Sequence, residues 1–298
     1  MKSFEALIRL ARARGSRRCV VVKAEDEAAL EGIKLAQDLG LITPVLVGDK
    51  HGIAGIAKKV GLDTTPCEIH HEPEENQAII KAIALVKEQG DFLMKGMLST
   101  SAFLKGVMHR ETGLRQETIL SHIAALEIPG YHKLLFMSDG GMNPRLNLET
   151  RIEIIRNAID TLRLLGIEQP KIALVAASEM INPDMPETVD AAKIAELNRT
   201  GRLAGAVIDG PFGFDVAVSK KAASTKKIDS TVAGDADFIL MPNISAANIW
   251  AKGLMYFCRT RAAGMVAGAL RPIIMLSRAD DPQTKLNSIA LGVVIAHR

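Results

Sequence analysis

The run Glu149–Ala176, ETRIEIIRNAIDTLRLLGIEQPKIALVA, joins a helix pattern directly to a strand pattern. Its first part repeats large aliphatic residues at the spacing of one helical face: Ile152, Ile155, Ile159 and Leu162. Gly166 follows where a glycine commonly ends a helix. The aliphatic run Lys171–Ala176 then predicts a buried strand. A helix that leads into a buried strand is the repeating unit of α/β proteins.

The same alternation recurs along the chain. Further buried strands are predicted at Cys19–Val22, Val45–Val47, Leu203–Ile208 and Phe238–Met241. Helices are predicted at Ala28–Leu39 and Glu75–Lys87, and a last helix begins at Pro282 with Asp281 as its N-cap. This order favours an α/β fold with two α/β domains and mostly parallel sheets. We place one domain at residues 1–135 and 277–298 and the other at residues 136–276.

Composition excludes several classes of protein. The 298 residues are 48% hydrophobic and 24% charged, which is ordinary for a globular enzyme. The net charge is only +3, and no Lys/Arg block is interleaved with aromatic residues, so we expect no nucleic-acid partner. The N-terminal segment is charged throughout and no window is long and apolar enough to span a membrane, so we expect neither a signal peptide nor a membrane anchor. Three scattered cysteines are typical of reduced thiols in a cytoplasmic protein.

Five polar segments follow apolar strands, where open α/β sheets bind their ligands. They are Phe92–Ser101, Phe136–Pro144, Val207–Asp215, Val232–Asn248 and Met275–Asp281. In the first, a Lys-Gly turn precedes hydroxyls at a helix N-terminus, which suits an anion. A surface lysine with ordinary helix caps is an equally good reading. In the last, Asp281 suffices as the cap, which leaves Arg278 to bind phosphate and Asp280 to accept a proton.

The middle segments are weaker signals when each is taken alone. The glycines Gly140 and Gly141 could simply form a turn. Asp209 could bind substrate or cap the next helix. Asp235 and Asp237 are expected to be solvated turn residues. The chain has no phosphate-binding loop, dinucleotide fingerprint or nucleophile elbow, and its histidines are scattered, so we expect neither a metal site nor Ser-His-Asp chemistry.

Taken in order, the motifs are far more specific. They are Lys95-Gly96 with Thr100, Ser138-Asp139-Gly140-Gly141 with Asn143-Pro144, Asp209-Gly210-Pro211, Val232–Asp237, Ser277-Arg278-Ala279-Asp280 and Lys285–Leu291. This series resembles the phosphate acetyl/butyryltransferase family, and its butyryltransferase-like branch in particular. The resemblance covers essentially the whole chain.

The resemblance implies an enzyme with its active site in a cleft between two α/β domains, commonly a homodimer. It implies direct transfer of a short acyl group between coenzyme A and inorganic phosphate, with acyl phosphate as the other acyl carrier. Coenzyme A is then a substrate, and no cofactor is permanently bound. We expect these substrate-binding residues: Lys95, Gly96, Thr100, Asp139, Asn143, Asp209 and Asn248.

The catalytic group is expected at the start of the last helix. Ser277 would hydrogen-bond the thiol or the carbonyl, Arg278 would hold phosphate, and Asp280 would take the thiol proton. Asp209 and Thr284 are the alternatives for the base. Two other functions stay open at this point. One is a dehydrogenase on a related two-domain scaffold, and the other is a non-enzymatic protein that binds acyl-CoA or acyl phosphate.

Overall fold

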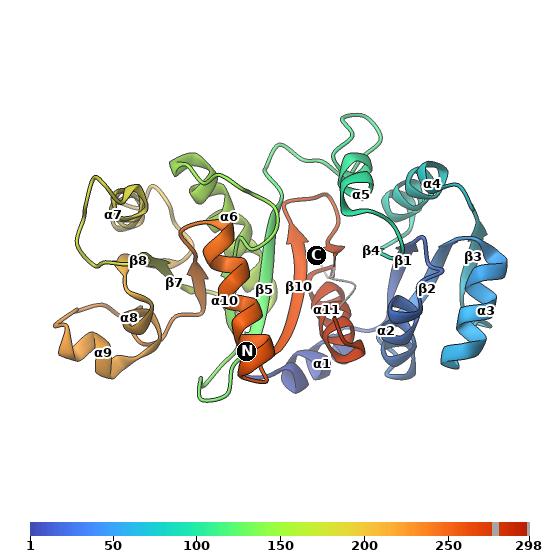
Figure 1. Cartoon of the computed structure of the whole chain (residues 1–298), viewed down its shortest axis with the longest axis horizontal. Coiled ribbons are helices and arrows are strands. Elements are labelled where there is room, and N and C mark those ends of the chain that lie inside the picture. Colours follow the sequence, from blue (N-terminus) through green and yellow to red (C-terminus); the bar gives the residue numbers. More distant parts are fainter. Residues whose placement is uncertain (276–279, 297–298) are drawn as a thin grey trace. The chain divides into compact units, whose positions relative to one another are not determined.

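The computed structural model describes residues 1–275 and 280–296 of the chain. Its contacts divide the chain into two compact units. The central unit contains Met1–Ser3 and Ile119–Ala262, and the terminal unit contains Phe4–Thr118 and Ala263–Arg298. Each unit is built from strands that alternate with helices (Figure 1). The predicted α/β class with mostly parallel pairing is confirmed.

The units divide the chain earlier than we expected, after residues 118 and 262 rather than after residues 135 and 276. Strand β5 (Ser121–Glu127) pairs antiparallel with β6 (Leu135–Ser138), and both therefore belong to the central unit. Strand β11 (Ile273–Ile274) pairs in parallel with β4 (Phe92–Lys95) and belongs to the terminal unit. Local patterns do not reveal such pairings, because the β11 and β4 partners are far apart in the sequence.

In the described part of the terminal unit the strand order is β3, β2, β1, β4, β11, β10. Neighbours are parallel except β10 and β11. The remaining strands of this unit are β1 (Arg17–Val22), β2 (Ile42–Gly48), β3 (Glu68–His71) and β10 (Arg261–Ala267). Its helices are α1 (Phe4–Ala13), α2 (Glu27–Asp38), α3 (Lys50–Val60), α4 (Glu75–Glu88), α5 (Thr100–Val107) and α11 (Pro282–Ile295).

Strand order tells which face each helix covers. The chain steps from β1 to β2 to β3 through α2 and α3, and α4 then returns it past β1 to β4. Parallel crossovers are right-handed, so steps in opposite directions place their helices on opposite faces. Helix α11 packs against α2 and α1 against α11, whereas α5 packs against α4. Both faces of this sheet are therefore covered.

The core of the terminal unit contains β1 and most of α11. Cys19, Val20 and Val21 have no exposed surface, as expected for a parallel strand with both faces covered. Every residue of α11 from Thr284 to Ile295 is buried, which is more than the single apolar stripe predicts. The polar members are hydrogen-bonded: Ser288 Oγ accepts from Gly264 N at 2.9 Å and donates to Thr284 O at 2.8 Å.

The strands of the central unit have the order β5, β6, β9, β7, β8. All neighbours are parallel except β5 and β6. The remaining strands are β7 (Lys171–Val175), β8 (Val207–Phe212) and β9 (Phe238–Leu240). The helices are α6 (Leu148–Leu164), α7 (Pro186–Arg199), α8 (Phe214–Val218), α9 (Lys220–Thr225) and α10 (Ile244–Phe257). By the same handedness argument, α6 and α7 cover one face while α8 and α9 cover the other.

The predicted strand Leu203–Ile208 is shifted in the structure, where β8 begins at Val207 and continues through Pro211 to Phe212. Gly205 has a φ of +103°, which favours glycine and ends the preceding turn just before the strand. Strand β8 is the last in the order, so one of its sides has no neighbouring strand. A proline, which has no N–H to donate, is tolerated in such an edge strand, as Pro211 is here. Within the described residues, no helix combines the length and apolar character needed to cross a membrane.

Candidate active site

The Lys95–Gly96 turn lies at the carboxyl end of β4 in the terminal unit, beside the end of β1. Lys95 pairs with Val22 in the sheet register and is only 9% exposed. Gly96 donates to Val22 O at 2.9 Å, and a Cβ added at Gly96 would lie 2.2 Å from Lys23 O. No side chain fits at Gly96, so this glycine lets the two strand-end loops approach. The buried Lys95 ammonium donates to Gly96 O at 3.3 Å.

Thr100 is the first residue of α5, but it does not cap the helix. The N-cap is Ser99, whose Oγ accepts from Ala102 N at 3.1 Å. Thr100 itself is exposed. The capping hydrogen bond therefore does not occupy the Thr100 hydroxyl, and the anion-binding role that we predicted for Thr100 stays a prediction.

Sequence reasoning missed Lys23 and Glu25, which follow β1 at the same edge of the sheet. Lys23 has a φ of +53°, and its ammonium pairs with Glu25 and donates to Pro73 O at 2.9 Å. A Cβ added at Gly48, at the end of β2, would lie 2.0 Å from Glu25 Oε2. The signal was present in the sequence, because a Lys-Ala-Glu run directly follows the buried strand Cys19–Val22.

The start of α11 confirms the predicted cap. Asp281 Oδ1 accepts from Thr284 N at 2.6 Å, so Asp281 is the N-cap. The neighbouring Asp280 is half-buried, and its backbone carbonyl accepts from the ammonium of the buried Lys285. Ser277 and Arg278 lie outside the described residues.

Asp139 organises the turn that follows β6 in the central unit. The residue is fully buried. Asp139 Oδ1 accepts from Gly141 N and Met142 N, each at 2.8 Å. Asp139 Oδ2 accepts from Asn143 Nδ2 at 2.6 Å and from His122 N at 3.2 Å. Four donors thus surround the carboxylate, which makes Asp139 a residue that shapes the Gly140–Asn143 turn.

Two amide side chains and one guanidinium hold this edge of the central unit together. Asn143 Nδ2 also donates to Leu120 O at 2.8 Å, and Asn248 Nδ2 on α10 donates to Gly140 O at 3.1 Å. Arg151, in the first turn of α6, donates to Pro242 O at 2.9 Å. Burial lowers the pKa of the Arg151 guanidinium, and the nearby Asp190 opposes that shift. The ends of β6 and β9 are therefore tied by direct hydrogen bonds.

Asp209 is not part of this cluster. It lies within β8 opposite Ala173, and its Oδ1 accepts from Gly210 N at 2.8 Å. Strand β8 is three positions from β6, which is about 14 Å at roughly 4.8 Å per strand. The structure thus brings Asp139, Asn143 and Asn248 together around one turn and leaves Asp209 apart.

Glu179, which follows β7, links that strand end to the end of β8. Its Oε1 accepts from Gly213 N at 3.1 Å and from Lys226 Nζ at 2.7 Å. The hydrogen bond from Lys226 lowers the pKa of the Glu179 carboxyl, with burial acting in the opposite direction. The carboxyl edge of the central unit is therefore fixed by side chains at several strand ends.

Asp235 and Asp237 are not the solvated turn residues that we expected. Asp235 accepts from Lys171 at 2.5 Å, from His132 at 2.8 Å and from Lys133 at 2.9 Å. Burial raises the pKa of Asp235, but these hydrogen bonds outweigh it and hold the pKa well below its usual range. Asp237 is buried and accepts from Lys133 at 2.6 Å. Because Lys171 opens β7 and Asp237 precedes β9, this ion-pair network lies at the amino ends of the strands, away from Asp139.

Within residues 1–275 and 280–296, no three His, Cys, Asp or Glu side chains gather closely enough to hold a metal ion. What the described site residues offer instead is a protected ammonium at Lys95 and a rigid amide-rich turn around Asp139. The Lys95 ammonium is suited to anionic ligands.

Comparison with known proteins gives one consistent result. Residues 53–293 match the family model described as "Phosphate acetyl/butaryl transferase". The chain is 38% identical to the phosphate butyryltransferase of Clostridium acetobutylicum, over 99% of both chains. It is 36% identical to the phosphate acetyltransferase of Rhizobium meliloti, over 99% of this chain and 94% of that one.

A solved structure agrees with the sequence relatives. The branched-chain phosphotransacylase from Enterococcus faecalis V583 superposes with a TM-score of 0.82 at 27% identity, covering 94% of this chain and 99% of that one. The family match, the full-length relatives and the shared fold together show that the chain belongs to the phosphate acetyl/butyryltransferase family.

Proposed function

We propose that this chain, a phosphate acyltransferase, transfers a short acyl group, butyryl or acetyl, reversibly between coenzyme A and inorganic phosphate. The family match and the full-length relatives support the reaction class. The dehydrogenase and the non-enzymatic binding protein that the sequence left open receive no such support. The observation on the molecule that best fits the proposal is the 9% exposed Lys95 beside a glycine that admits no side chain.

The proposed chemistry is a direct displacement. The thiol of coenzyme A loses its proton to Asp280, and the thiolate attacks the carbonyl carbon of an acyl phosphate. A carbon–sulfur bond forms, the carbon–oxygen bond to phosphate breaks, and inorganic phosphate leaves with the electron pair. In this proposal Ser277 hydrogen-bonds the thiol or the carbonyl, while Arg278 holds the phosphate. Asp209 and Thr284 remain the alternatives for the base.

The residues outside the catalytic group have supporting roles. Lys95 supplies a positive charge to the phosphate, where a protected ammonium is stronger than one in water. Gly96 brings backbone close to the ligand, and Thr100 adds a hydroxyl at the start of α5. Asp139 shapes the turn that is proposed to face the substrate; Asn143 donates to Asp139, and Asn248 donates to Gly140 O in the same turn. Asp209 is proposed to contact the substrate from β8.

A thiol-release assay tests the function. Release of free coenzyme A from acetyl-CoA, butyryl-CoA and longer acyl-CoA substrates is measured with and without inorganic phosphate. Turnover that depends on phosphate is expected, and thiol release at the same rate without phosphate would refute the reaction. Lys95→Gln should raise the KM for phosphate about tenfold or more, since a hydrogen bond to a charged group contributes about 1.5–3 kcal/mol. The control is Lys105→Gln, which removes the same charge from an exposed position on α5.

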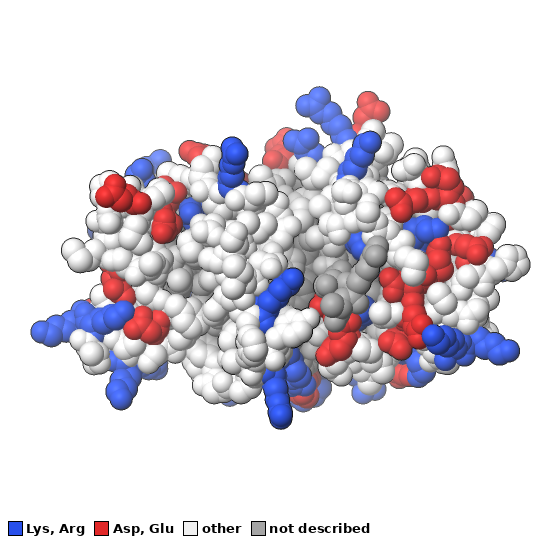
Figure 2. Space-filling model, viewed as in Figure 1, with Lys and Arg blue, Asp and Glu red and all other residues white. Residues whose placement is uncertain are grey.

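We also propose that the enzyme is a homodimer that uses the outer face of α10. Three large side chains on this helix are strongly exposed: Ile249 at 71%, Tyr256 at 75% and Phe257 at 89%. Lys252 is the one charged residue in the α10 sequence, and Figure 2 shows few charged side chains over this part of the central unit. An exposed apolar face of this kind is typical of an interaction surface.

The oligomeric state tests this surface. Light scattering during gel filtration is expected to give twice the mass of one chain. The Ile249→Asp/Phe257→Asp variant is expected to give the mass of a single chain. A monomeric parent protein would refute the dimer, and a variant that remains dimeric would refute the α10 interface. We further propose a cytoplasmic location, which is consistent with three cysteines present as free thiols.

A further inference from the structure

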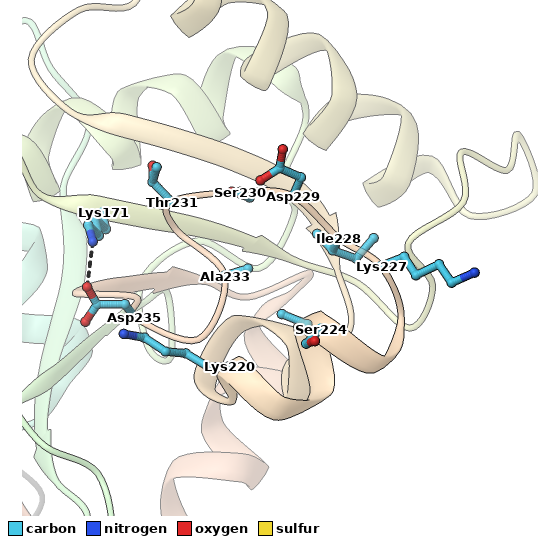
Figure 3. A pocket seen from close by; sticks show the side chains of 11 residues that line it. Lys171, Lys220, Ser224, Lys227, Ile228, Asp229, Ser230, Thr231, Ala233 and Asp235 are labelled. Carbon is cyan, nitrogen blue, oxygen red and sulfur yellow. Dashed lines mark hydrogen bonds and ion pairs between the residues drawn. The ribbon is translucent and has the colours of Figure 1, made fainter.

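A pocket lies on the central unit, and its lining includes Lys171 at the amino end of β7, the opposite edge of the sheet from Asp139. It opens between α9, the segment 226–235 and the start of β7, and its volume is about 660 Å³ (Figure 3). Strand β7 is five residues long, so its two ends are about 13 Å apart at roughly 3.3 Å per residue. We call this site the lysine pocket, because three lysines line it: Lys171, Lys220 and Lys227.

The walls of the lysine pocket are firmly built. Gly234 has a φ of +71°, and a Cβ added there would lie 2.4 Å from Lys220 N. Gly234 N also donates to Val216 O at 2.8 Å. Val232, Ala233 and Ala236 beside it are buried in the core cluster of the unit. The segment that faces α9 is therefore held in place before any ligand arrives, as in most binding pockets.

A lysine occupies a backbone position that usually favours glycine. After α9, Lys227 N donates to Ser224 O at 3.1 Å and Ile228 N donates to Ala223 O at 2.9 Å, the two bonds of a Schellman motif. Lys227 is the left-handed residue of that motif, with a φ of +55°. A non-glycine residue in the left-handed region costs conformational energy, so Lys227 is a less favourable residue than glycine at this position. In Figure 3 the Lys227 side chain points away from the other lining residues, while Lys220 extends toward Asp235.

The charges around the pocket leave it cationic. Lys171 and Lys133 are paired with Asp235, and Lys133 is also paired with Asp237. The charges of these two lysines and two aspartates therefore cancel. Within the described part of the chain, Lys220 and Lys227 have no carboxylate within ion-pair distance. Asp229 is the other acidic residue of the lining, and it is exposed. One net positive charge therefore remains at this site.

Hydroxyl groups complete the lining. Ser224, Ser230 and Thr231 line the pocket. Ser230 Oγ accepts from Val232 N at 3.2 Å, which leaves its O–H available as a donor. Lysine ammonium groups and serine or threonine hydroxyls are the donors that commonly bind phosphate oxygens. The pocket is too polar to favour an apolar ligand, and its volume falls in the range of small-molecule sites, about 300–1,000 Å³.

We propose that the lysine pocket binds a small phosphate-bearing organic molecule, at a site separate from the residues of the acyl transfer. Lys220 supplies the main charge to the phosphate group, and Ser230 and Thr231 are proposed to donate hydrogen bonds to it. This inference does not depend on the proposed acyl-transfer reaction, because none of the residues proposed for that reaction lines the pocket.

Calorimetric titration with glycerol 3-phosphate tests the site, with glycerol in sodium chloride of matched ionic strength as the reference titrant. Lys220→Gln should weaken binding of the probe about tenfold, since it removes a charged hydrogen bond. Lys221→Gln is the matched control, because Lys221 on α9 is exposed like Lys220 but does not line the pocket. The control should change the affinity by less than about twofold, which is within the usual effect of an exposed charge. Lys220→Arg should retain binding.

Three outcomes would overturn the proposal. The first is a titration of the parent protein that equals the reference titration. The second is an equal loss of affinity in Lys220→Gln and Lys221→Gln, which would show a diffuse effect of surface charge. The third is a matching rise of the KM for inorganic phosphate in the transfer reaction of Lys220→Gln, which would make the pocket part of that reaction. If the parent protein shows no acyl transfer at all, the proposed function fails while the calorimetry still decides on the pocket.

Discussion

Replacing Asp139 by Asn tests whether its carboxylate builds the turn after β6. The amide keeps the size of the side chain but turns one acceptor oxygen into a donor. In the parent protein each Asp139 oxygen accepts two hydrogen bonds, from Gly141 and Met142 on one side and from His122 and Asn143 on the other. Whichever way the amide is oriented, two of the four donors then face an NH₂ group.

The magnitude follows from that count. A hydrogen bond to a charged group contributes about 1.5–3 kcal/mol when it is buried, so the loss of two should lower the free energy of unfolding by about 3–6 kcal/mol. Domains are typically stable by only about 5–15 kcal/mol, so the variant should be markedly destabilised. Turnover of acyl-CoA should fall together with stability, because the turn is proposed to face the substrate.

Urea unfolding followed by circular dichroism measures this loss, and thiol release measures turnover. Asp209→Asn is the control for stability alone, because Asp209 is itself proposed to contact the substrate. Its half-buried carboxylate accepts one described hydrogen bond, which an amide oxygen can also accept. We expect the control to change stability by less than about 1 kcal/mol. If Asp139→Asn loses turnover but less than about 1 kcal/mol of stability, Asp139 contacts the substrate directly and the structural reasoning is wrong.

Three further predictions concern the catalytic group, acid stability and metal dependence. Asp280→Asn should lower turnover by roughly 10²–10⁴ with folding preserved, whereas Asp281→Ala should cost about 1 kcal/mol of stability and spare turnover; the reverse pattern would exchange their roles. The depressed pKa of Asp235 contributes stability above the unfolded value of about 3.9 that is lost as pH falls below it. Asp235→Asn should therefore flatten the pH dependence of unfolding below about pH 4, and an unchanged slope would contradict the assignment. Turnover should survive a chelator such as EDTA, and loss with recovery on adding a divalent ion would refute the metal-free displacement.

Much of the fold could be read from the sequence, because local periodicity and capping are properties of neighbouring residues. The predicted helix Glu149–Leu165 matches α6, which spans Leu148–Leu164, and Gly166 has the expected positive φ of +81°. The N-cap at Asp281 is also confirmed, since a cap depends on residues three positions apart. Strand β8 begins at Val207 rather than at the predicted Leu203, because the turn at Gly205 depends on contacts with α6 that the local sequence does not show.

The candidate site could be read only in part. The ordered motifs identified the family, and they located the Lys95–Gly96 turn and the Asp139 turn at strand ends. They could not show that Asp139 is saturated by four donors, because one of them, His122 N, comes from a different segment, on β5. They also took Asp235 for a solvated turn residue, since its partners Lys133 and Lys171 are 102 and 64 residues away.

The sequence by itself determined the α/β class, the family, and which segments carry polar side chains at strand ends, since all three depend on residue types and short spacings. The tertiary structure decided where the units divide, which carboxylates are buried in hydrogen bonds, and which lysines remain unbalanced at the lysine pocket. The physical reason is that strand pairing and charge balance join residues that are distant along the chain. Gly96 illustrates both levels: its place after a strand is visible in the sequence, but the 2.2 Å approach of Lys23 O that forbids a side chain exists only in the folded chain.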